Sequence, residues 1–233
     1  MKFISVIPAR KGSKGIKNKN ILKIFRKKLV EYTFEAAKKS KVKNNFVLTD
    51  SEKIKKISKK YKINSTYIRP KILSKDKTSL SETLYDFYLW TKRKNFFFDY
   101  LIVLQPTSPL RDHNDINKSI NIIKKNKTKS LFSISSSIEH PYETIKIKGK
   151  KSWQYILKNA KNYTRRQDFD FNSYFINGAI YIIHRDLVKN NKISNFDNHS
   201  LYLMPKNKSL EINDMEEVKI IDSIIRFKKN DKN

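Results

Sequence analysis

Short apolar runs alternate with segments of helical periodicity over the first 135 residues, and this alternation limits the fold more than any other feature of the sequence. Each run has four to six residues, many of them β-branched or aromatic, as in buried parallel strands. The runs are Lys2–Ile7, Asn45–Thr49, Ser65–Ile68, Tyr100–Gln105 and Ser130–Ser135. Between them, apolar residues recur at helical spacing in Leu29–Ser40, Ser51–Tyr61, Ser79–Lys94 and Asn114–Asn126. This order predicts a mostly parallel, doubly wound α/β sheet with helices on both faces and ligands at the carboxyl ends of the strands.

The pattern changes after the fifth run. Residues 139–157 predict a strand or hairpin excursion that turns at Gly149, and residues 160–174 predict an irregular loop of polar and aromatic residues. The remaining expected elements are strands over Asn177–Ile183 and Ser200–Pro205 and a closing helix over Asp214–Lys228. No internal repeat or linker divides the chain, and 233 residues with 38% hydrophobic content can bury one core. We therefore expect a single domain over residues 1–233, with residues 138–172 as a small excursion from it.

The charge balance bears on the partner. The chain has 51 Lys and Arg against 22 Asp and Glu, a formal net charge of +29, which is typical of nucleic-acid-binding proteins. The lysines are spread over almost every expected helix together with Asn and Ile, which A/T-rich codons also favour. Solvated helix faces are therefore the favoured interpretation, with no specific nucleic acid as partner, and a basic nucleic-acid-binding α/β protein is the alternative.

Missing sequence features exclude other classes. The chain has no cysteine, so disulfides, thiolate metal sites and cysteine nucleophiles are excluded. No apolar run approaches the roughly 20 residues that cross a bilayer, and the apolar start of the chain is too short for a signal-peptide core. We therefore expect a cytoplasmic protein without a membrane partner.

The stretch IPARKGSKGIKNKNI, from Ile7 to Ile21, places two of the chain's four glycines among many cations. Glycine lets the backbone approach a ligand closely or adopt a positive φ. The first strand delivers this loop to the carboxyl edge of the sheet, where cations and backbone N–H groups can surround a triphosphate. The side chains suited to this are Arg10, Ser13, Lys14 and Lys19. The spacing matches neither a Walker A motif nor G-x-G-x-x-G, so an ordinary solvated turn is the alternative.

A second polar cluster, LQPTSPLR, follows the fourth expected strand. Two of the chain's six prolines stiffen this turn and present Gln105, Thr107 and Ser108 at the same edge of the sheet. Rigid polar donors suit the recognition of a base or a hydroxylated ligand. The alternative is a capped turn that leads into the helix after Asp112.

Taken together, these motifs resemble a known family. The opening loop, LQPTSPLR and the run NGAIYI, with shorter matches TD, RP and RRQ between them, follow the order and approximate spacing of the acylneuraminate cytidylyltransferases, the CMP-sialic acid synthetases. The resemblance covers nearly the whole chain. It implies a nucleotidyltransferase-type sheet and the transfer of CMP from CTP to the anomeric hydroxyl of a nonulosonic acid, a 2-keto sugar acid, with release of pyrophosphate.

The resemblance also implies roles for single residues. Arg10 and Lys19 would act as catalytic cations on the phosphates. The implied nucleotide site comprises Arg10, Gly12, Ser13, Lys14, Gly15, Lys19, Asn20, Asp50 and Arg69. The implied acceptor site comprises Gln105, Ser108, Arg166, Asn177 and Gly178, with the forked guanidinium of Arg166 on the acceptor carboxylate. Dimers of this family form through exchanged extensions, so residues 138–172 are interpreted as a dimerisation arm and substrate loop of a homodimer.

The segment SLEINDMEEV departs from the resemblance. The family usually carries an Asp-x-Asp pair for Mg²⁺ here, whereas this chain offers Glu211 and Asn213, with Asp214 as an alternative ligand. Both side chains supply oxygen, so Mg²⁺ or Mn²⁺ is the implied cofactor. The other interpretation of the segment is an acidic N-terminal helix cap.

The acceptor segment departs as well. Glu143 and Phe175 stand where enzymes for sialic acid tend to carry cations, so a Kdo, pseudaminic or legionaminic type of acid is the alternative acceptor. His140, in the same segment, could serve as a general base, but a turn or packing histidine is the favoured interpretation.

Overall fold

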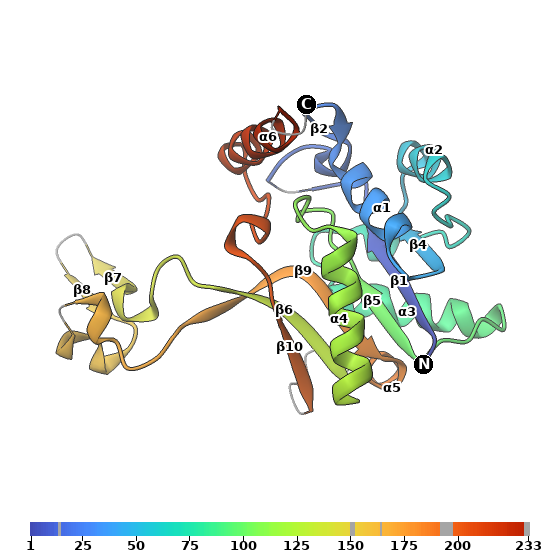
Figure 1. Ribbon diagram of the computed structural model, residues 1–233. Helices are drawn as coiled ribbons and strands as arrows, with labels where there is room; N and C mark the ends of the chain where they lie inside the picture. Colours follow the sequence, from blue (N-terminus) through green and yellow to red (C-terminus); the bar gives the residue numbers. More distant parts are fainter. Residues whose placement is uncertain (14, 150–151, 164, 192–197, 231–233) are drawn as a thin grey trace.

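The computed structural model describes residues 1–13, 15–149, 152–163, 165–191 and 198–230, and its described part is built on a six-stranded sheet (Figure 1). The strand order is β10-β6-β9-β5-β1-β4. Every strand is parallel to the others except β9, which is antiparallel to both of its neighbours. The strands are β1 Phe3–Pro8, β4 Asn44–Leu48, β5 Tyr100–Val103, β6 Ser130–Ser136, β9 Tyr174–His184 and β10 His199–Leu203. The predicted mostly parallel α/β sheet is confirmed.

Helices cover both faces of this sheet (Figure 1). They are α1 Leu29–Lys39, α2 Glu52–Lys60, α3 Leu80–Arg93, α4 His113–Asn126, α5 Arg185–Lys189 and α6 Met215–Asn230. The apolar sides of α1, α2 and α4 pack on one face, and those of α3 and α5 pack on the other. The described helix α6 packs on a third cluster, around Ile24, Leu29 and Leu110, beyond the carboxyl edge of the sheet. No helix in the described ranges is both long enough and apolar enough to span a membrane.

The predicted helices agree closely with the observed ones because local caps set their starts. Ser79 and Glu82 form a reciprocal capping box at α3, and Asp112 and Asp115 form another at α4. The side chain of Ser51 caps α2 in the same way by accepting the N–H of Ile54.

The strand predicted over Ser65–Ile68 is wrong. This segment makes only isolated bridges to the edge of the sheet, Phe46 with Asn64 and Thr49 with Ile68. The side chain of Asn64 accepts hydrogen bonds from both the N–H and the hydroxyl of Thr66, at 2.8 and 2.7 Å. Such local side-chain bonds turn the backbone and compete with a strand ladder. Helix α5 and the short ribbon of β2 Lys23–Ile24 and β3 Lys27–Lys28 are elements that the pattern did not predict.

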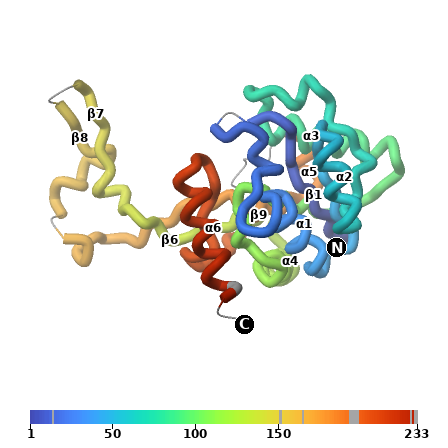
Figure 2. Tube along the Cα trace, turned by 90° about the horizontal axis from the view of Figure 1, so that it is seen from above, coloured from blue at the N-terminus to red at the C-terminus, as the bar shows by residue number. Residues whose placement is uncertain are grey.

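The described residues of the segment 137–173, which we call the arm, extend away from the sheet (Figures 1 and 2). The N–H of Ser137 donates to the carbonyl of Ser173 at 3.0 Å and closes the base of the arm. The predicted hairpin is confirmed as β7 Ile145–Gly149 paired with β8 Ser152–Tyr155. Short 3₁₀ turns complete the described chain: Lys19–Ile21, Lys71–Ser74, Pro141–Glu143, Lys158–Asn162, Arg166–Asp168 and Lys206–Lys208.

Candidate active site

Loops that follow β1, β5 and β10 meet at the carboxyl edge of the sheet and line a cavity of about 450 Å³. Its lining residues are Pro8, Arg10, Ser13, Gly15, Lys19, Asn20, Arg69, Thr78, Leu80, Gln105, Pro106, Thr107 and Asn213. Most of the predicted nucleotide residues are therefore brought together with one predicted acceptor residue and one predicted metal ligand. Lys14 lies outside the described residues.

The basic loop is held against the segment that precedes α6. A Cβ atom at Gly15 would lie 2.7 Å from the backbone oxygen of Asn213, a separation that real Cβ atoms do not show. The Lys19 ammonium donates to the carbonyl of Ile212 at 3.0 Å, and the Asn20 side chain donates to the carbonyl of Arg10 at 2.9 Å. A Cβ at Gly12 would meet nothing within 4 Å. The glycine at position 15 is therefore explained by close packing against the segment that contains Asn213.

Two guanidinium groups stand on the nucleotide side of the cavity. Arg10 forms an ion pair with Asp76 at 2.7 Å and also donates to the carbonyl of Ser74. Arg69 is buried and donates through two nitrogens to the carbonyl of Leu73, at 3.0 and 2.6 Å. Burial lowers the pKa of Arg69, and the charge of Arg10 acts in the same direction. The cavity therefore has two cations on this side, Arg10 paired with Asp76 and Arg69 bonded only to a backbone carbonyl among the described residues.

Asp50 supports the basic loop from a neighbouring hollow. Its carboxylate accepts the backbone N–H of Lys11 at 2.7 Å. It lines a separate hollow of about 380 Å³ together with Asn18, Asn20 and Ser51, at the start of α2. Its observed contact is therefore with the loop backbone.

The turn after β5 is joined directly to the segment before α6. The Thr107 hydroxyl donates to a carboxylate oxygen of Glu211 at 2.6 Å, and the N–H of Ile212 donates to the carbonyl of Thr107 at 2.9 Å. Ser108 is fully buried, and its hydroxyl has no partner among the described residues. Thr107 was noted in the sequence only as a polar residue of the turn, whereas the structure makes it the contact to Glu211.

Gly178 brings β9 close to both of these segments. It has a φ of +66°, and a Cβ there would lie 3.6 Å from the Gln105 amide nitrogen and 3.6 Å from a carboxylate oxygen of Glu211. Burial raises the pKa of Tyr181, the Glu211 carboxylate adds to the rise, and the nearby Gln105 side chain opposes it. Tyr181 was not singled out from the sequence, since a tyrosine in an apolar run is typical of a core strand.

Asn177 lies beneath this group. It is buried, its side-chain oxygen accepts the Ser133 hydroxyl at 2.6 Å, and its amide donates to Ser209 at 3.0 Å. These contacts hold β9 to β6 and to the chain after β10. Its implied role as an acceptor ligand stays a prediction.

Arg166 lies in the arm and does not line the cavity (Figure 1). It pairs with Glu139 at 2.6 Å and with Glu143 at 2.8 Å, and the hydrogen bond to Glu143 is the main cause of its raised pKa. The nearby His140 packs on Phe169, with ring centroids 4.3 Å apart. Its Nε2 lies 3.0 Å from the carbonyl of Phe171, the contacts expected of a packing histidine.

The predicted metal segment leads into α6. Asp214 accepts the backbone N–H groups of Glu216 and Glu217, at 2.9 and 3.0 Å, so it caps the start of α6. Asn213 donates its side-chain amide to Glu217 at 3.4 Å, which leaves its side-chain oxygen as the ligand atom it can offer. Within the described chain, no group of three or more His, Cys, Asp or Glu residues is placed to hold a metal.

Solved structures with the same architecture establish the fold class. The chain is similar to CMP:2-keto-3-deoxy-manno-octonic acid synthetase complexed with CTP, with a TM-score of 0.71 at 15% identity, over 98% of this chain and 100% of that one. A cytidylyltransferase family profile matches residues 4–220. The chain therefore belongs to the cytidylyltransferase family of nucleotidyltransferases.

Curated relatives agree over most of the chain. It is 31% identical to the post-translational flagellin modification protein B of Campylobacter coli, over 97% of this chain and 96% of that protein. It is 31% identical to the N-acylneuraminate cytidylyltransferase of Escherichia coli, over 99% of this chain and 54% of that protein. It is 27% identical to the pseudaminic acid cytidylyltransferase of Campylobacter jejuni, over 94% of each.

Proposed function

We propose that this protein transfers CMP from CTP to the anomeric hydroxyl of a nonulosonic acid. The acceptor oxygen attacks the α-phosphorus, the bond from that phosphorus to the oxygen bridging the β-phosphate breaks, and pyrophosphate leaves as the hydroxyl loses its proton. The observation that carries the proposal is the cavity in which Arg10 and Lys19 face Gln105 across the carboxyl edge. The family match and the relatives named for sugar acids support it.

Positioning and charge account for the chemistry. The basic loop supplies cations for the negative charge that develops on the departing pyrophosphate, and such prearranged charges lower the barrier of phosphoryl transfer. The turn after β5 lines the same cavity, where Gln105 would orient the acceptor hydroxyl for attack in line with the leaving group.

A divalent cation is part of the proposal. Glu211 has one carboxylate oxygen bonded to Thr107, and Asn213 lines the cavity, so the segment offers hard oxygen ligands beside the phosphates. Mg²⁺ commonly binds one or two carboxylates and completes its shell with water and phosphate oxygens, so this small ligand set fits Mg²⁺ or Mn²⁺. The ion would neutralise charge on the phosphates when bound.

The metal proposal predicts a defined set of responses. Activity should disappear in EDTA and return with Mg²⁺ or Mn²⁺. Glu211→Gln should raise the Mg²⁺ concentration for half-maximal rate about tenfold or more, because it removes a charge without changing size. Asp214→Asn, the control, weakens the helix cap and should leave the Mg²⁺ requirement unchanged. Full turnover in EDTA would refute the metal site. A raised Mg²⁺ requirement in Asp214→Asn alone would show that the carboxylate ligand is Asp214 and not Glu211.

We also propose that two copies of the chain associate through the arm in the cytoplasm. Ile147 and Trp153 on the hairpin are 74% and 56% exposed, and Leu203 on the sheet edge is 55% exposed. Leu201 and Ile176 extend this apolar surface over β10 and β9. A second copy is the occupant that would bury it and at the same time bring Arg166 to the neighbouring cavity.

The activity is tested by a pyrophosphate-release screen of CTP, UTP, ATP and GTP against a panel of 2-keto sugar acids. We expect CTP to exceed UTP, since a site built for cytosine leaves buried groups unpaired with uracil. Equal kcat/KM for CTP and UTP would contradict the proposal.

The same panel compares sialic acid with Kdo, pseudaminic and legionaminic acids. One of these alternatives is the second candidate, because Glu143 and Phe175 stand where the resemblance to enzymes for sialic acid implies cations, and Glu143 is paired with Arg166. A steep salt dependence of binding to random duplex DNA, with no transfer to any acid, would instead support the nucleic-acid alternative.

A further inference from the structure

Arg111 is buried beneath the turn after β5, with only 2% of its surface exposed. One terminal nitrogen, Nη1, donates to the carbonyl of Gln105 at 3.1 Å and to the carbonyl of Ala179 at 3.0 Å. The other, Nη2, donates to the Thr33 hydroxyl at 2.7 Å. One side chain therefore joins the end of β5, the middle of β9 and helix α1.

The charge of Arg111 is not matched by a contacting partner. Among the described residues, no carboxylate lies within 4 Å of its guanidinium, and its Nε has no hydrogen-bond partner. Burial lowers its pKa to about 10, partly offset by the charges of Asp115 and Asp112, so it is still a cation at neutral pH. A buried cation without a contacting counter-ion is unfavourable, and well-packed apolar residues can replace buried charges without loss of stability. Fold stability alone therefore does not explain an arginine here.

We propose that Arg111 is a positioning residue for the acceptor side of the cavity. Its Nη1, held in place because Nη2 is bonded to Thr33, fixes the distance between the backbone of Gln105 and that of Ala179, which follows Gly178. Because the Gln105 side chain lies against Gly178, this distance sets where the Gln105 amide points. The proposal rests on the proposed function only in taking Gln105 as an acceptor contact.

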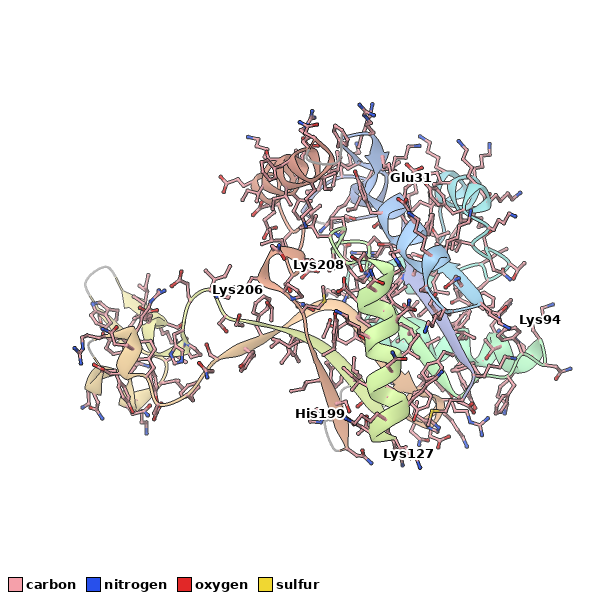
Figure 3. The ribbon with its side chains drawn as sticks, viewed as in Figure 1. Glu31, Lys94, Lys127, His199, Lys206 and Lys208 are labelled. Atoms are coloured by element: carbon pink, nitrogen blue, oxygen red, sulfur yellow. The ribbon has the colours of Figure 1, made fainter. Side chains whose placement is uncertain are left out.

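The surroundings of Arg111 are arranged to hold this clamp in place. The next residue, Asp112, forms an ion pair with Lys208 at 2.6 Å, on the connection between β10 and α6 beside the start of α4 (Figure 3). Behind Arg111 lies a cavity of about 610 Å³, where Lys39 and Lys208 are already paired with Glu35 and Asp112. That space lets a shorter or unforked side chain at position 111 move, so the anchoring of Nη2 on Thr33 is what keeps Nη1 on the two carbonyl groups.

A double-mutant cycle tests the proposal. Arg111→Lys keeps the charge but is shorter and has no second nitrogen to anchor it on Thr33, so it cannot hold one nitrogen on both carbonyl groups. It should raise the KM for the acceptor about tenfold and that for CTP less than about twofold. In a Gln105→Ala background the same change should alter the acceptor KM less than about twofold, since a residue that acts through Gln105 loses its effect with it. Arg93→Lys, at the exposed end of α3, is the matched control and should behave as wild type.

Additive effects in the cycle, or equal increases in both KM values, would overturn the proposal. If Arg111→Lys does not fold, Thr33→Val takes its place in the same cycle, because it removes the partner of Nη2. It should raise the KM for the acceptor about threefold.

A second measurement does not depend on catalysis. Hydrogen exchange of residues 103–109 and 177–181 should become faster in Arg111→Lys than in wild type, while exchange in α3 stays the same. Unchanged exchange in both segments would overturn the clamp. Failure of wild type to release pyrophosphate with any acceptor would instead contradict the proposed function and leave the exchange result to decide the clamp.

Discussion

At the scale of single residues, the structure explains the glycines at positions 15 and 178 in different ways and does not require the one at position 12. Gly15 is required because the backbone of Asn213 lies where a side chain would start, and Gly178 is required by its positive φ. Gly12 has neither restriction in the structure. The composition of the loop predicted a phosphate cradle that uses both of its glycines. In the structure, packing against Asn213 requires Gly15, whereas no protein contact requires Gly12.

Gly15→Ala should lower kcat/KM by about tenfold or more, because the new methyl group must push the 211–214 segment away from the cavity. Gly12→Ala is the matched control and should retain activity within about twofold, since its Cβ meets nothing in the protein. Pyrophosphate-release assays on both variants measure the difference. If Gly12→Ala were the more damaging change, close approach of the nucleotide to Gly12 would outweigh the packing at Gly15.

Arg10→Ala should lower kcat about a hundredfold while the protein stays folded, as when one prearranged donor to developing charge is removed. Thermal unfolding should change little, because the ion pair it loses, with Asp76, is partly exposed. The exposed Arg93→Ala serves as the control for loss of an arginine. Near-normal turnover of Arg10→Ala with CTP would remove the basic loop from the reaction.

At the scale of elements, the start of α4 is joined by ion pairs to the chain segment between β10 and α6. Asp112 caps α4 and pairs with Lys208, and Lys208 also reaches Asp115, which accepts the Tyr202 hydroxyl at 2.8 Å. Lys208 stands three residues before Glu211, so this cluster fixes the chain that carries the proposed metal ligand (Figure 3).

The cluster predicts a pH dependence of stability. Burial alone would raise the pKa of Asp112, but the hydrogen bond from Lys208 and those from nearby backbone N–H groups outweigh it and hold the pKa below its ordinary 3.8. Between the two pKa values the unfolded chain binds more protons, so this stabilisation is complete above the unfolded pKa and is lost as the pH falls through the folded one.

Urea unfolding of wild type and Asp112→Asn between about pH 6 and pH 2.5 measures this effect, since other carboxyl groups titrate in both proteins. Asp112→Asn should be less stable at the upper end, and the gap should narrow below about pH 4. A gap that stays constant over the whole range would contradict the shifted pKa.

At the scale of the whole molecule, the predicted site residues are divided between the edge of the sheet and the arm. The cavity lies at the sheet edge, whereas Arg166 is carried on the projecting arm, paired with Glu139 and Glu143 (Figures 1 and 2). The extended shape suggests that an arm serves the cavity of a second copy.

Complementation tests that arrangement. Arg166→Ala and Arg10→Ala should each be nearly inactive alone, but co-expression should restore about a quarter of wild-type activity, because half of the dimers are mixed and each mixed dimer has one intact site. A mixture no more active than its parts would show that Arg166 does not act across subunits. Size-exclusion chromatography with light scattering, which should report a dimer, provides the independent check.

The sequence by itself determined what depends on neighbours along the chain. Alternating apolar runs predicted the parallel sheet, and helical spacing of apolar residues predicted the helices. The observed starts agree because caps such as the one formed by Ser79 and Glu82 span only three or four residues. It also brought together, through motif order, most of the residues that line the cavity. It failed at Ser65–Ile68, where a side-chain turn at Asn64 prevailed over strand propensity.

Only the tertiary structure decided the roles that depend on residues far apart in the chain. The need for Gly15 comes from Asn213, and the two carbonyl partners of Arg111 lie on different strands. Arg166 was predicted to bind an acceptor carboxylate, but in the structure it pairs with two carboxylates of its own arm, Glu139 and Glu143. No local pattern encodes such contacts, because packing at the carboxyl edge of a sheet joins segments whose separation in sequence is unrelated to their distance in space.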